Sequence, residues 1–335
     1  MRINRSDLMN LPPSTPAAIR ALVSGQVSVA EMRAMRPLPE NAQKLIDDAV
    51  VRVGLDRLTV VGDVLAAGLR YNLTDFWGVT QIQWDEMAEV GYARRTMNPQ
   101  ARGENQLTER RARRLPVYLT WDSFELGVRT LAASQRVGAP IDTTLIEQKT
   151  RRVNEAIEDA MINGVAQNVF GDTIPGLMNA PNVNAYEYEL VGGTWTAAAK
   201  TGQQILDDVL GMITLAHTAH RYGPYNLYVN TAYDVVLNKN FVTNYPTTIR
   251  ERLQQIQAGG RNLVVKAADM LATNRTVLVQ MTSDVVDVIA GQEPTVLSWE
   301  GASGLDLHWM VMACMVPRVK TDFGDSSGIV TGNVA

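Results

Sequence analysis

Alternating apolar and polar positions mark two segments in the first third of the chain. Residues 79–94 place apolar and polar side chains on opposite parities, with Ile82, Trp84, Val90 and Tyr92 against Gln81, Gln83 and Asp85. The alternation resumes after residue 115, with Val117, Leu119 and Trp121 against Tyr118, Thr120 and Asp122. A period of two is that of a half-buried strand. The pattern therefore predicts a long hairpin over residues 77–126, with Trp84, Tyr92, Tyr118 and Trp121 on its strands.

The predicted tip of this hairpin is rich in arginine. Between residues 94 and 114 there are seven arginines against Glu104 and Glu109, a local balance of +5. These arginines are Arg94, Arg95, Arg102, Arg110, Arg111, Arg113 and Arg114. Arginine without lysine favours bidentate pairing with carboxylates, so salt bridges between subunits are our first interpretation. A solvated tip and a nucleic-acid contact are the alternatives, although no aromatic residues interleave the tip for base stacking.

Two amphipathic helices follow the hairpin. The first is predicted over about residues 143–168, opening with Thr144 and Glu147 as a capping box and extending roughly 36 Å. Its apolar face is Leu145, Val153, Ala156, Ile157, Ala160 and Met161. The second opens at Thr201 with Gln204 as its box partner and ends at Gly223-Pro224. Its apolar face is Ile205, Val209, Met212, Ile213 and Ala216.

The second half of the chain mixes helices and strands. Short helices are predicted at residues 232–239 and 248–257, and strands at 226–229, 262–265, 277–281 and 285–289. A very apolar strand over residues 305–320, broken by Pro317, is too apolar to be exposed on both faces and should be central in its sheet. The fold class is therefore α+β.

The N-terminal region has a different composition. Residues 1–45 are punctuated by prolines, which leave room only for short helical pieces such as Ala17–Val23. These prolines are Pro12, Pro13, Pro16, Pro37 and Pro39. Residues 41–69 have helical character. The region is interpreted either as a disordered tail or as an arm that becomes ordered on a neighbouring subunit.

Composition narrows the class of protein. The chain has 335 residues, of which 46% are hydrophobic and 20% charged, and a net charge of -4. These values are typical of a folded protein and do not mark a nucleic-acid binder. A lone Cys314 excludes an intramolecular disulfide framework. Without an apolar run of about 20 residues or a secretory signal, we expect a soluble, intracellular protein that does not contact a membrane.

Candidate chemistry is sparse. Residues 324–328 match the G-x-S-x-G pattern of serine hydrolases around Ser326, but no histidine follows in the chain to complete that arrangement, so a surface turn is favoured. His217 and His220 have a spacing that could hold a metal, but no complementary ligand stands nearby. His308 is interpreted as a core histidine, and Cys314 as a buried residue with a packing role only. We expect no cofactor, no metal and no enzymatic activity.

The order of these segments resembles a known family. The hairpin is followed by the long helix, then by Ile174-Pro175-Gly176-Leu177-Met178-Asn179, then by Gly223-Pro224-Tyr225 leading into Leu227–Asn230, then by Val285–Gly291 and the last apolar strand. Over about residues 75–330 this arrangement is similar to the Johnson fold, the Hong Kong 97-like major capsid fold of tailed phages, and within it to the encapsulin-like branch.

The resemblance implies a division of the subunit. Residues 1–75 would be an N-terminal arm with a lead-in helix, 76–130 the extended E-loop hairpin, and 131–201 a P-domain with the long helix as its spine. Residues 202–295 would be the A-domain, and 296–335 a closing strand that returns to the P-domain, followed by a polar C-terminal tail.

The resemblance also implies a function. The chain would be the major capsid protein of a tailed phage, assembling with itself into hexamers and pentamers around double-stranded DNA in the virion. A portal and a scaffold or decoration protein would be further partners. An encapsulin compartment enclosing cargo enzyme is the alternative, and a serine hydrolase using Ser326 a remote one. Some family members cross-link covalently through a lysine in the E-loop, but this chain has no lysine between Lys44 and Lys149. We therefore expect no such cross-links.

Overall fold

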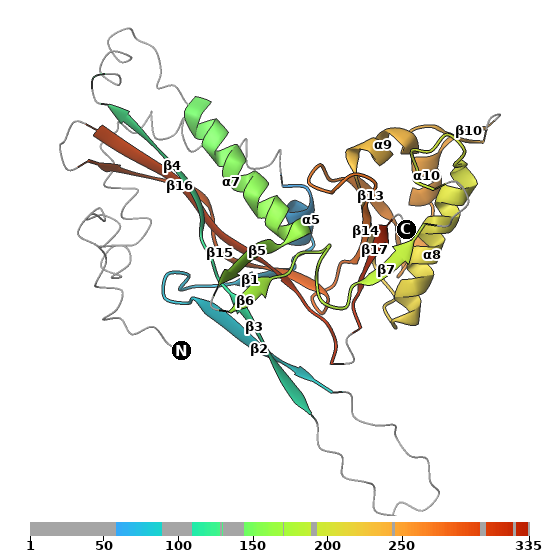
Figure 1. The fold of residues 1–335 in the computed structure, drawn as a ribbon, viewed down its shortest axis with the longest axis horizontal. Coiled ribbons are helices and arrows are strands. Elements are labelled where there is room, and N and C mark those ends of the chain that lie inside the picture. The colour runs from blue at the N-terminus through green and yellow to red at the C-terminus, as the bar shows by residue number, and fades with distance from the viewer. Residues whose placement is uncertain are drawn as a thin grey trace, which may run out of the picture. The chain divides into compact units, whose positions relative to one another are not determined.

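A computed structural model describes residues 58–88, 109–127, 129, 144–169, 171–188, 193–242, 245–301, 306–323 and 326–333. The chain divides into two compact units (Figure 1). The first comprises Met1–Thr80, Val117–Met161 and Val288–Pro317, and the second Gln81–Pro116, Ile162–Asp287 and Arg318–Ala335. The predicted N-terminal arm, residues 1–45, lies outside the described residues.

The first unit is built on a four-stranded sheet with a long helix. Its elements are α5 (Val60–Ala66), β1 (Arg70–Asn72), β4 (Thr120–Gly127), α7 (Thr144–Asn163), β15 (Val286–Glu300) and β16 (Asp306–Val319). The strand order is β1-β15-β16-β4, with β1 parallel to β15 and β4 antiparallel to β16. Lys149 of α7 pairs with Asp122 of β4 at 2.9 Å, so α7 lies on the Asp122 face of the sheet.

Strand β16 is an inner strand of this sheet, as its apolar sequence predicts. Its side chains from Val311 to Val316 are all almost completely buried. The prediction that Pro317 breaks the strand is wrong, because β16 continues to Val319. Proline removes one backbone donor, and the ladder with β4 already ends at Ala313. The pairing of β16 with β4 therefore does not require a backbone N–H group at Pro317.

The long helix α7 is shorter than predicted. It ends at Asn163 rather than near residue 168, because Gly164 takes a positive φ of 72° and the chain turns into strand β5. Four of the six residues predicted for its apolar face are buried: Val153, Ile157, Ala160 and Met161. Leu145 and Ala156, which we also expected to be buried, are exposed. Three polar residues that were not predicted there share the buried face: Thr150, Asn154 and Glu158.

Glu158 has a structural reason to lie on the buried face. Its two carboxylate oxygens accept hydrogen bonds from the backbone N–H groups of Val60, at 2.6 Å, and Val61, at 3.2 Å. These groups open helix α5, whose first N–H groups have no partner within the helix. A carboxylate is a favourable acceptor at this positive end of a helix. Glu158 therefore joins the long helix to α5, confirming helical structure in part of residues 41–69.

The second unit contains a five-stranded sheet and three helices. The sheet has the order β13-β8-β14-β17-β7. Its strands are β7 (Asn184–Glu187), β8 (Tyr225–Val229), β13 (Val264–Ala267), β14 (Thr276–Gln280) and β17 (Ile329–Asn333). The helices are α8 (Gly202–Thr218), α9 (Thr231–Leu237) and α10 (Ile249–Gln254). Four strand pairs complete the unit: β2–β3 (Gln81–Met87, Arg110–Pro116), β5–β6 (Val165–Val169, Asp172–Ile174), β9–β10 (Asn240–Val242, Tyr245–Thr248) and β11–β12 (Gln257–Ala258, Arg261–Asn262).

Local sequence signals are confirmed closely in this unit. Thr201 and Gln204 form the predicted capping box of α8, and Thr248 forms another with Glu251 at α10. All five residues predicted for the apolar face of α8 are buried in the core of the unit. The strand predicted at 285–289 is the start of a much longer one, β15.

The C-terminal residues are not the polar tail that the sequence predicted. Ile329–Asn333 form β17, which lies antiparallel to β14 and parallel to β7. Val330 is completely buried between Leu278 on one neighbour and Asn184 on the other. A short apolar run placed between two strands has both its donors and its acceptors satisfied, and this is why it folds into the sheet.

The turn Ile174–Asn179 fixes the end of α7 within the second unit. Asn179 accepts a hydrogen bond from Gly176 N at 2.7 Å and donates one to the carbonyl of Asn163 at 2.7 Å. A side chain on Gly176 would place its Cβ only 2.2 Å from the backbone nitrogen of Gly164. Glycine is therefore required at 176 by the close approach of two backbone segments.

Candidate functional site

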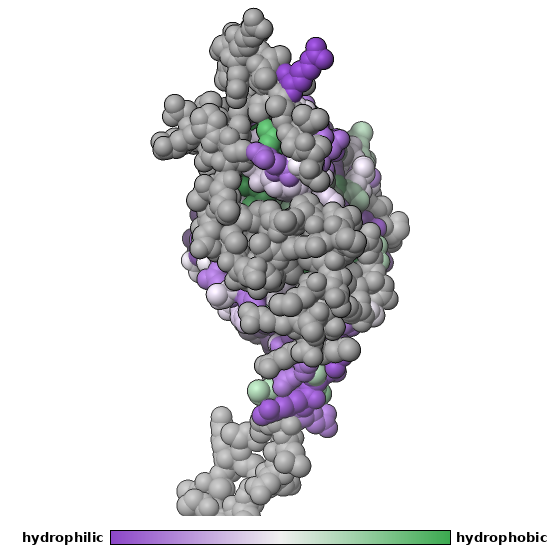
Figure 2. Space-filling model, turned by 90° about the vertical axis from the view of Figure 1, so that its left-hand side faces the viewer, coloured by the Kyte–Doolittle hydropathy of each residue, from purple (hydrophilic) through white to green (hydrophobic). Residues whose placement is uncertain are grey.

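The β2–β3 hairpin has two chemically different faces. The strands are antiparallel, with residue pairs running from Gln81 and Pro116 to Met87 and Arg110. Directly paired residues share a face. The exposed face carries Gln83, Asp85, Met87, Arg110, Ala112 and Arg114. The inner face carries Ile82, Trp84, Glu86, Arg111, Arg113 and Leu115. In the space-filling view this hairpin, near the bottom, is mostly hydrophilic (Figure 2).

An ion pair and a hydrogen bond attach the inner face of the hairpin to the rest of the second unit. Arg113 donates through Nε to Oε2 of Glu86 at 3.0 Å, and the Glu86 side chain is only 6% exposed. The other carboxylate oxygen of Glu86 accepts from the hydroxyl of Thr321 at 3.3 Å. A buried carboxylate is stable only when paired and hydrogen-bonded. Glu86 therefore links both hairpin strands to the segment that follows β16.

Two further arginines make contacts between the hairpin and β16 or the segment after it. Arg111 donates to the carbonyl of Phe323 at 3.4 Å, and its guanidinium lies 4.8 Å from the centre of the Phe323 ring. The guanidinium of Arg318 lies 5.5 Å from the ring of Trp84. Both are cation–π distances. Arg318 also pairs with Asp287, its Nε donating to Oδ1 at 2.7 Å, and Lys320 pairs with Asp287 at 2.7 Å.

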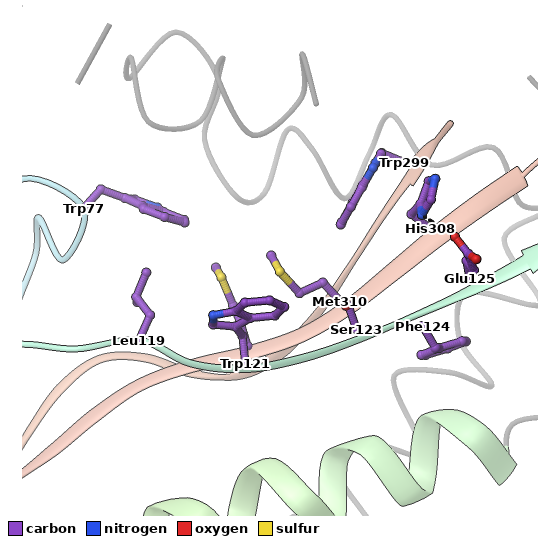
Figure 3. Close-up of a pocket in the computed structure, with 10 residues that line it drawn as sticks. Trp77, Leu119, Trp121, Ser123, Phe124, Glu125, Trp299, His308 and Met310 are labelled. Atoms are coloured by element: carbon purple, nitrogen blue, oxygen red, sulfur yellow. Dashed lines mark ion pairs between the residues drawn. The ribbon is translucent and has the colours of Figure 1, made fainter. Parts of the chain in front are cut away.

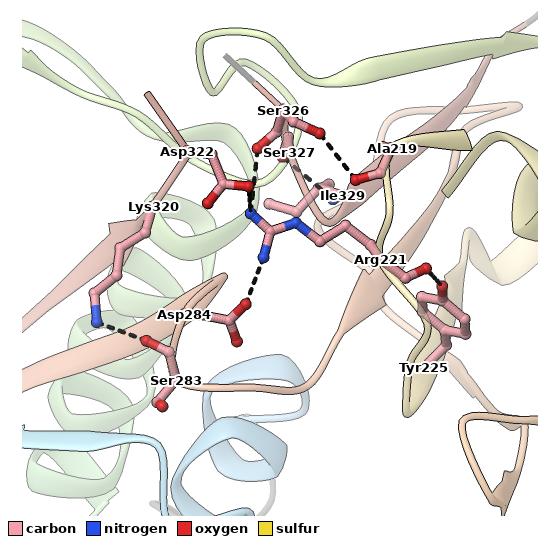
Figure 4. Close-up of polar contacts among 10 residues, drawn as sticks. All are labelled: Ala219, Arg221, Tyr225, Ser283, Asp284, Lys320, Asp322, Ser326, Ser327 and Ile329. Atoms are coloured by element: carbon pink, nitrogen blue, oxygen red, sulfur yellow. Dashed lines mark hydrogen bonds and ion pairs between the residues drawn. The ribbon is translucent and has the colours of Figure 1, made fainter. Parts of the chain in front are cut away.

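A second charge cluster fixes the chain after residue 320 (Figure 4). The Arg221 side chain is 8% exposed and pairs with both Asp284 and Asp322. In Figure 4 its guanidinium lies between these two carboxylates. The hydroxyl of Ser326 donates to the carbonyl of Ala219 at 3.1 Å. Ser326 is thus bonded to backbone rather than to an imidazole. The surface turn predicted here is wrong for its described part, because Ser327 is completely buried.

The structure changes the position of the predicted arginines. Arg110, Arg111, Arg113 and Arg114 lie in strand β3, not in a tip, so the prediction of a tip reaching residue 114 is wrong. The physical reason is that β3 pairs with β2, and the inner-face arginines find acceptors in Glu86 and in the carbonyl of Phe323. Arg94, Arg95, Arg102 and Tyr92 lie outside the described residues. Arg110 and Arg114 remain exposed, and neither forms an ion pair with another described residue.

Two of the predicted hairpin aromatics belong elsewhere. Tyr118 and Trp121 lie after β3, in the first unit, and β4 pairs with β16 rather than with β2. The prediction that they are hairpin residues is wrong, because the alternation before and after Pro116 belongs to two different sheets. Trp84 is on β2 as predicted. Burial raises the pKa of Tyr118 well above its usual value.

The remaining candidate residues have structural surroundings. His217 lies against the rings of Tyr222 and Tyr225, with ring centres 5.4 Å and 6.3 Å apart. His308 is not the core histidine that we predicted, because its side chain is 32% exposed and lies 3.6 Å from a Glu125 oxygen. Cys314 is completely buried as predicted, and burial raises the pKa of its thiol to about 11.

Within the described part of the chain, no group of three acidic, histidine or cysteine side chains is arranged to hold a metal ion. Among the same residues, no helix is long and apolar enough to span a membrane.

An apolar groove in the first unit was not predicted from the sequence (Figure 3). It has a volume of about 540 Å³, and Trp77, Trp121, Trp299, Met310 and Met312 line it. The local pattern gives little signal for the groove, because Ser123 and Glu125 share the parity of Trp121 on β4 and strand β16 is apolar on both parities. What could not be read from sequence is that the two strands are neighbours.

Comparison with solved structures identifies the fold. The chain matches the structure described as a virus-like particle from Pyrococcus furiosus with a TM-score of 0.59 at 14% identity, covering 86% of this chain and 98% of that one. It matches the capsid of Myoviridae phage XM1 with a TM-score of 0.61 at 12% identity, covering 81% and 91%. It matches a Mycobacterium phage Cain structure with a TM-score of 0.53 at 15% identity, covering 92% and 99%. No curated protein sequence matches the chain.

The fold is therefore that of the Hong Kong 97-like capsid proteins, in agreement with the resemblance seen in the sequence. Residues 78–332 match a family model described as a family of unknown function, DUF6260. The chain belongs to this family.

Proposed function

We propose that this protein is a shell subunit, the major capsid protein of a tailed phage with a double-stranded DNA genome. One observation carries the proposal. The likeness to a phage capsid chain and to a virus-like-particle chain covers 91% and 98% of those chains, so it involves whole subunits rather than a shared motif. We place the assembled protein in the virion.

The parts of the subunit take roles in this proposal. The β2–β3 hairpin with its connecting segment is the extended E-loop, residues 1–75 are the N-terminal arm with its lead-in helix, and α7 is the spine of the P-domain over 131–201. Residues 202–295 form the A-domain. Residues 296–335 are the closing strand, now with β17 in place of a tail.

The exposed face of the hairpin supports contact with a neighbouring subunit. Arg110 and Arg114 stand on it with one carboxylate, Asp85, between them on the partner strand. A two-stranded hairpin is marginally stable alone, and arginine is well suited to pairing with carboxylates across an interface. We infer that these two arginines form salt bridges between copies of the chain in its hexamers and pentamers.

Negative-stain microscopy of the purified full-length protein tests the proposal. We expect closed shells of uniform diameter, and a monodisperse monomer at high concentration would contradict it. Particles isolated from their natural source should contain double-stranded DNA, with a portal at one vertex and a scaffold or decoration protein where assembly needs one.

An encapsulin-like compartment is the second candidate. The likeness to the virus-like particle from Pyrococcus furiosus, over 98% of that chain, favours it. Shells that enclose protein cargo and lack nucleic acid would support this candidate over the phage head. In neither case do we assign catalysis, and replacing Ser326 with alanine should leave assembly unchanged.

A further inference from the structure

One face of the four-stranded sheet in the first unit carries an open aromatic groove. Strand β4 alternates, so Trp121, Ser123 and Glu125 lie on one side and Asp122 and Phe124 on the other. Asp122 pairs with Lys149 of α7. Figure 3 shows Phe124 directed toward α7, and Trp121 and Met310 directed away from it into the groove. The groove is thus on the face opposite the long helix.

The floor of the groove is apolar and buried, and Trp121 beside it is exposed. Met310 and Met312 belong to a small cluster with Leu297, against which Trp77 and Trp299 pack. The side chain of Trp121 is 60% exposed, the second largest value among the large hydrophobic residues of the described chain. A groove with a buried methionine floor and an exposed tryptophan is typical of a docking surface.

One end of the groove is acidic. The Glu125 side chain is 73% exposed, and its Oε2 lies 3.6 Å from Nδ1 of His308. His308 in turn stacks on Trp299, with ring centres 5.7 Å apart. An occupant that fits this groove presents two or three aliphatic side chains in a row and a single cation beside them.

The N-terminal region of this chain contains such a segment. Thr15 and Pro16 are a typical helix start, and Gly25 is a typical stop. Between them, Ile19, Leu22 and Val23 stand at positions i, i+3 and i+4, the spacing by which a helix places anchors in a groove. Arg20 flanks this apolar face and is the only charged residue from Pro16 to Val23.

We propose that residues 16–23 fold as a short helix in the Trp121 groove of their own chain, with Arg20 beside Glu125. A helix of this length is marginal in water, so the groove supplies the apolar contacts that stabilise it. Residues 24–57 connect this segment to the first described residue, Leu58, and a chain of that length can span at most roughly 110 Å. Attachment to the same chain raises the effective concentration of the segment at its own groove. The docking occurs within one subunit and does not depend on the proposed shell function.

Fluorescence quenching on unassembled full-length protein tests this docking. The variant Ser24→Cys is labelled with bimane, a dye that tryptophan quenches on contact. The only natural thiol, Cys314, is completely buried and is not labelled in the folded protein. We expect quenching that is relieved by Trp121→Phe, while the same dye on Ser6→Cys is not quenched. Absence of quenching on residue 24 would overturn the proposal.

Two comparisons distinguish this docking from chance contact of the dye and from docking on a second copy. The double variant Ile19→Asp, Leu22→Asp should weaken docking at least about tenfold, whereas Ala21→Asp, on the opposite side of the predicted helix, should leave it intact. Quenching within one chain is independent of concentration. Quenching that disappears on dilution, or on mixing with excess unlabelled Trp121→Phe protein, would assign the segment to a second copy and overturn docking in its own chain. Shell formation is measured separately by microscopy, so the two proposals can fail independently.

Discussion

Glu86 and Arg113 form an ion pair across the two strands of the β2–β3 hairpin, with 3.0 Å between Oε2 and Nε. Glu86 also accepts a hydrogen bond from the hydroxyl of Thr321. The ion pair is therefore connected to the segment that follows β16. The hairpin is therefore held on its inner face by contacts within the subunit, while its outer face keeps Arg110 and Arg114 exposed. Substitutions on the inner face should therefore change the stability of the subunit, whereas substitutions on the outer face should change assembly.

Replacing Glu86 with glutamine should lower the free energy of unfolding by about 2–3 kcal/mol, because Arg113 is left beside a largely buried neutral group. Urea denaturation of the unassembled protein measures this. The matched control is Asp85→Asn on the exposed face, which should change stability by less than about 0.5 kcal/mol. Equal effects of the two substitutions would contradict the assigned faces.

Reversing the charge of the exposed arginines should block assembly. In the double variant Arg110→Glu, Arg114→Glu, the proposed salt bridges become repulsions, while stability stays within about 0.5 kcal/mol of the natural protein because both side chains are exposed. Size-exclusion chromatography and microscopy measure the loss of shells. Arg252→Glu with Arg261→Glu, an equal charge change elsewhere on the second unit, is the control. Normal shells from the first variant would remove the hairpin arginines from the interface.

The Gly176→Ala variant should be strongly destabilised. Its Cβ would lie 2.2 Å from Gly164 N, so one backbone segment must shift and the two hydrogen bonds of Asn179 are strained. We expect a loss of roughly 3 kcal/mol or more, measured by thermal or urea unfolding. Gly62→Ala is the matched control, since its new Cβ meets nothing closer than 4.0 Å and alanine favours a helix. A Gly176→Ala protein as stable as this control would refute the close approach.

Stability should fall in alkaline solution through Cys314. Burial raises the pKa of its thiol from 9.0 to about 11, so the folded state keeps a proton that the unfolded state has lost. This contribution is complete below pH 9 and declines as the pH rises from 9 to 11, by up to about 3 kcal/mol. Tyr225 and Tyr233, whose pKa values burial raises to about 12, add to the decline above pH 10. A Cys314→Ala protein should show a shallower fall between pH 9 and 11, and an unchanged slope would exclude the thiol as a cause.

Boiled, denatured particles should give one monomer band on a gel. Covalent cross-linking in related shells relies on a lysine of the extended loop, and this chain has none between residues 44 and 149. A ladder of covalent oligomers would contradict the expectation. Stability of the particle then rests on non-covalent contacts, and it should decrease as salt screens the exposed arginine pairs.

Local chemistry made much of the fold predictable. The capping box at Thr201 involves residues three positions apart, and the apolar face of α8 follows from a period of 3.6. Both features depend only on residues within one turn or one helix. The inner position of β16 was also predictable, since a strand apolar on both parities must be covered on both faces.

The errors came where a segment's partner lies far away in the chain. Glu158 lies on the buried face of α7, where we did not expect it, because its partners are the N–H groups of residues 60 and 61, almost a hundred positions earlier. Residues 329–333 were interpreted as a tail because nothing near them indicates that β14 and β7 lie on either side. In both cases the sequence around the segment does not indicate which distant residues it contacts.

The amino-acid sequence alone determined the approximate positions of the longer helices, the inner position of the last long strand and the absence of a lysine from the hairpin, because all of these depend on residue type and short spacing. Only the tertiary structure decided which arginines of the hairpin are satisfied, that the alternation on the two sides of Pro116 belongs to different sheets, and that Trp121, Trp299 and Met310 line one groove. Pairing between strands distant in the chain sets these relationships, and the free energy of such pairing depends on the whole fold rather than on any one segment.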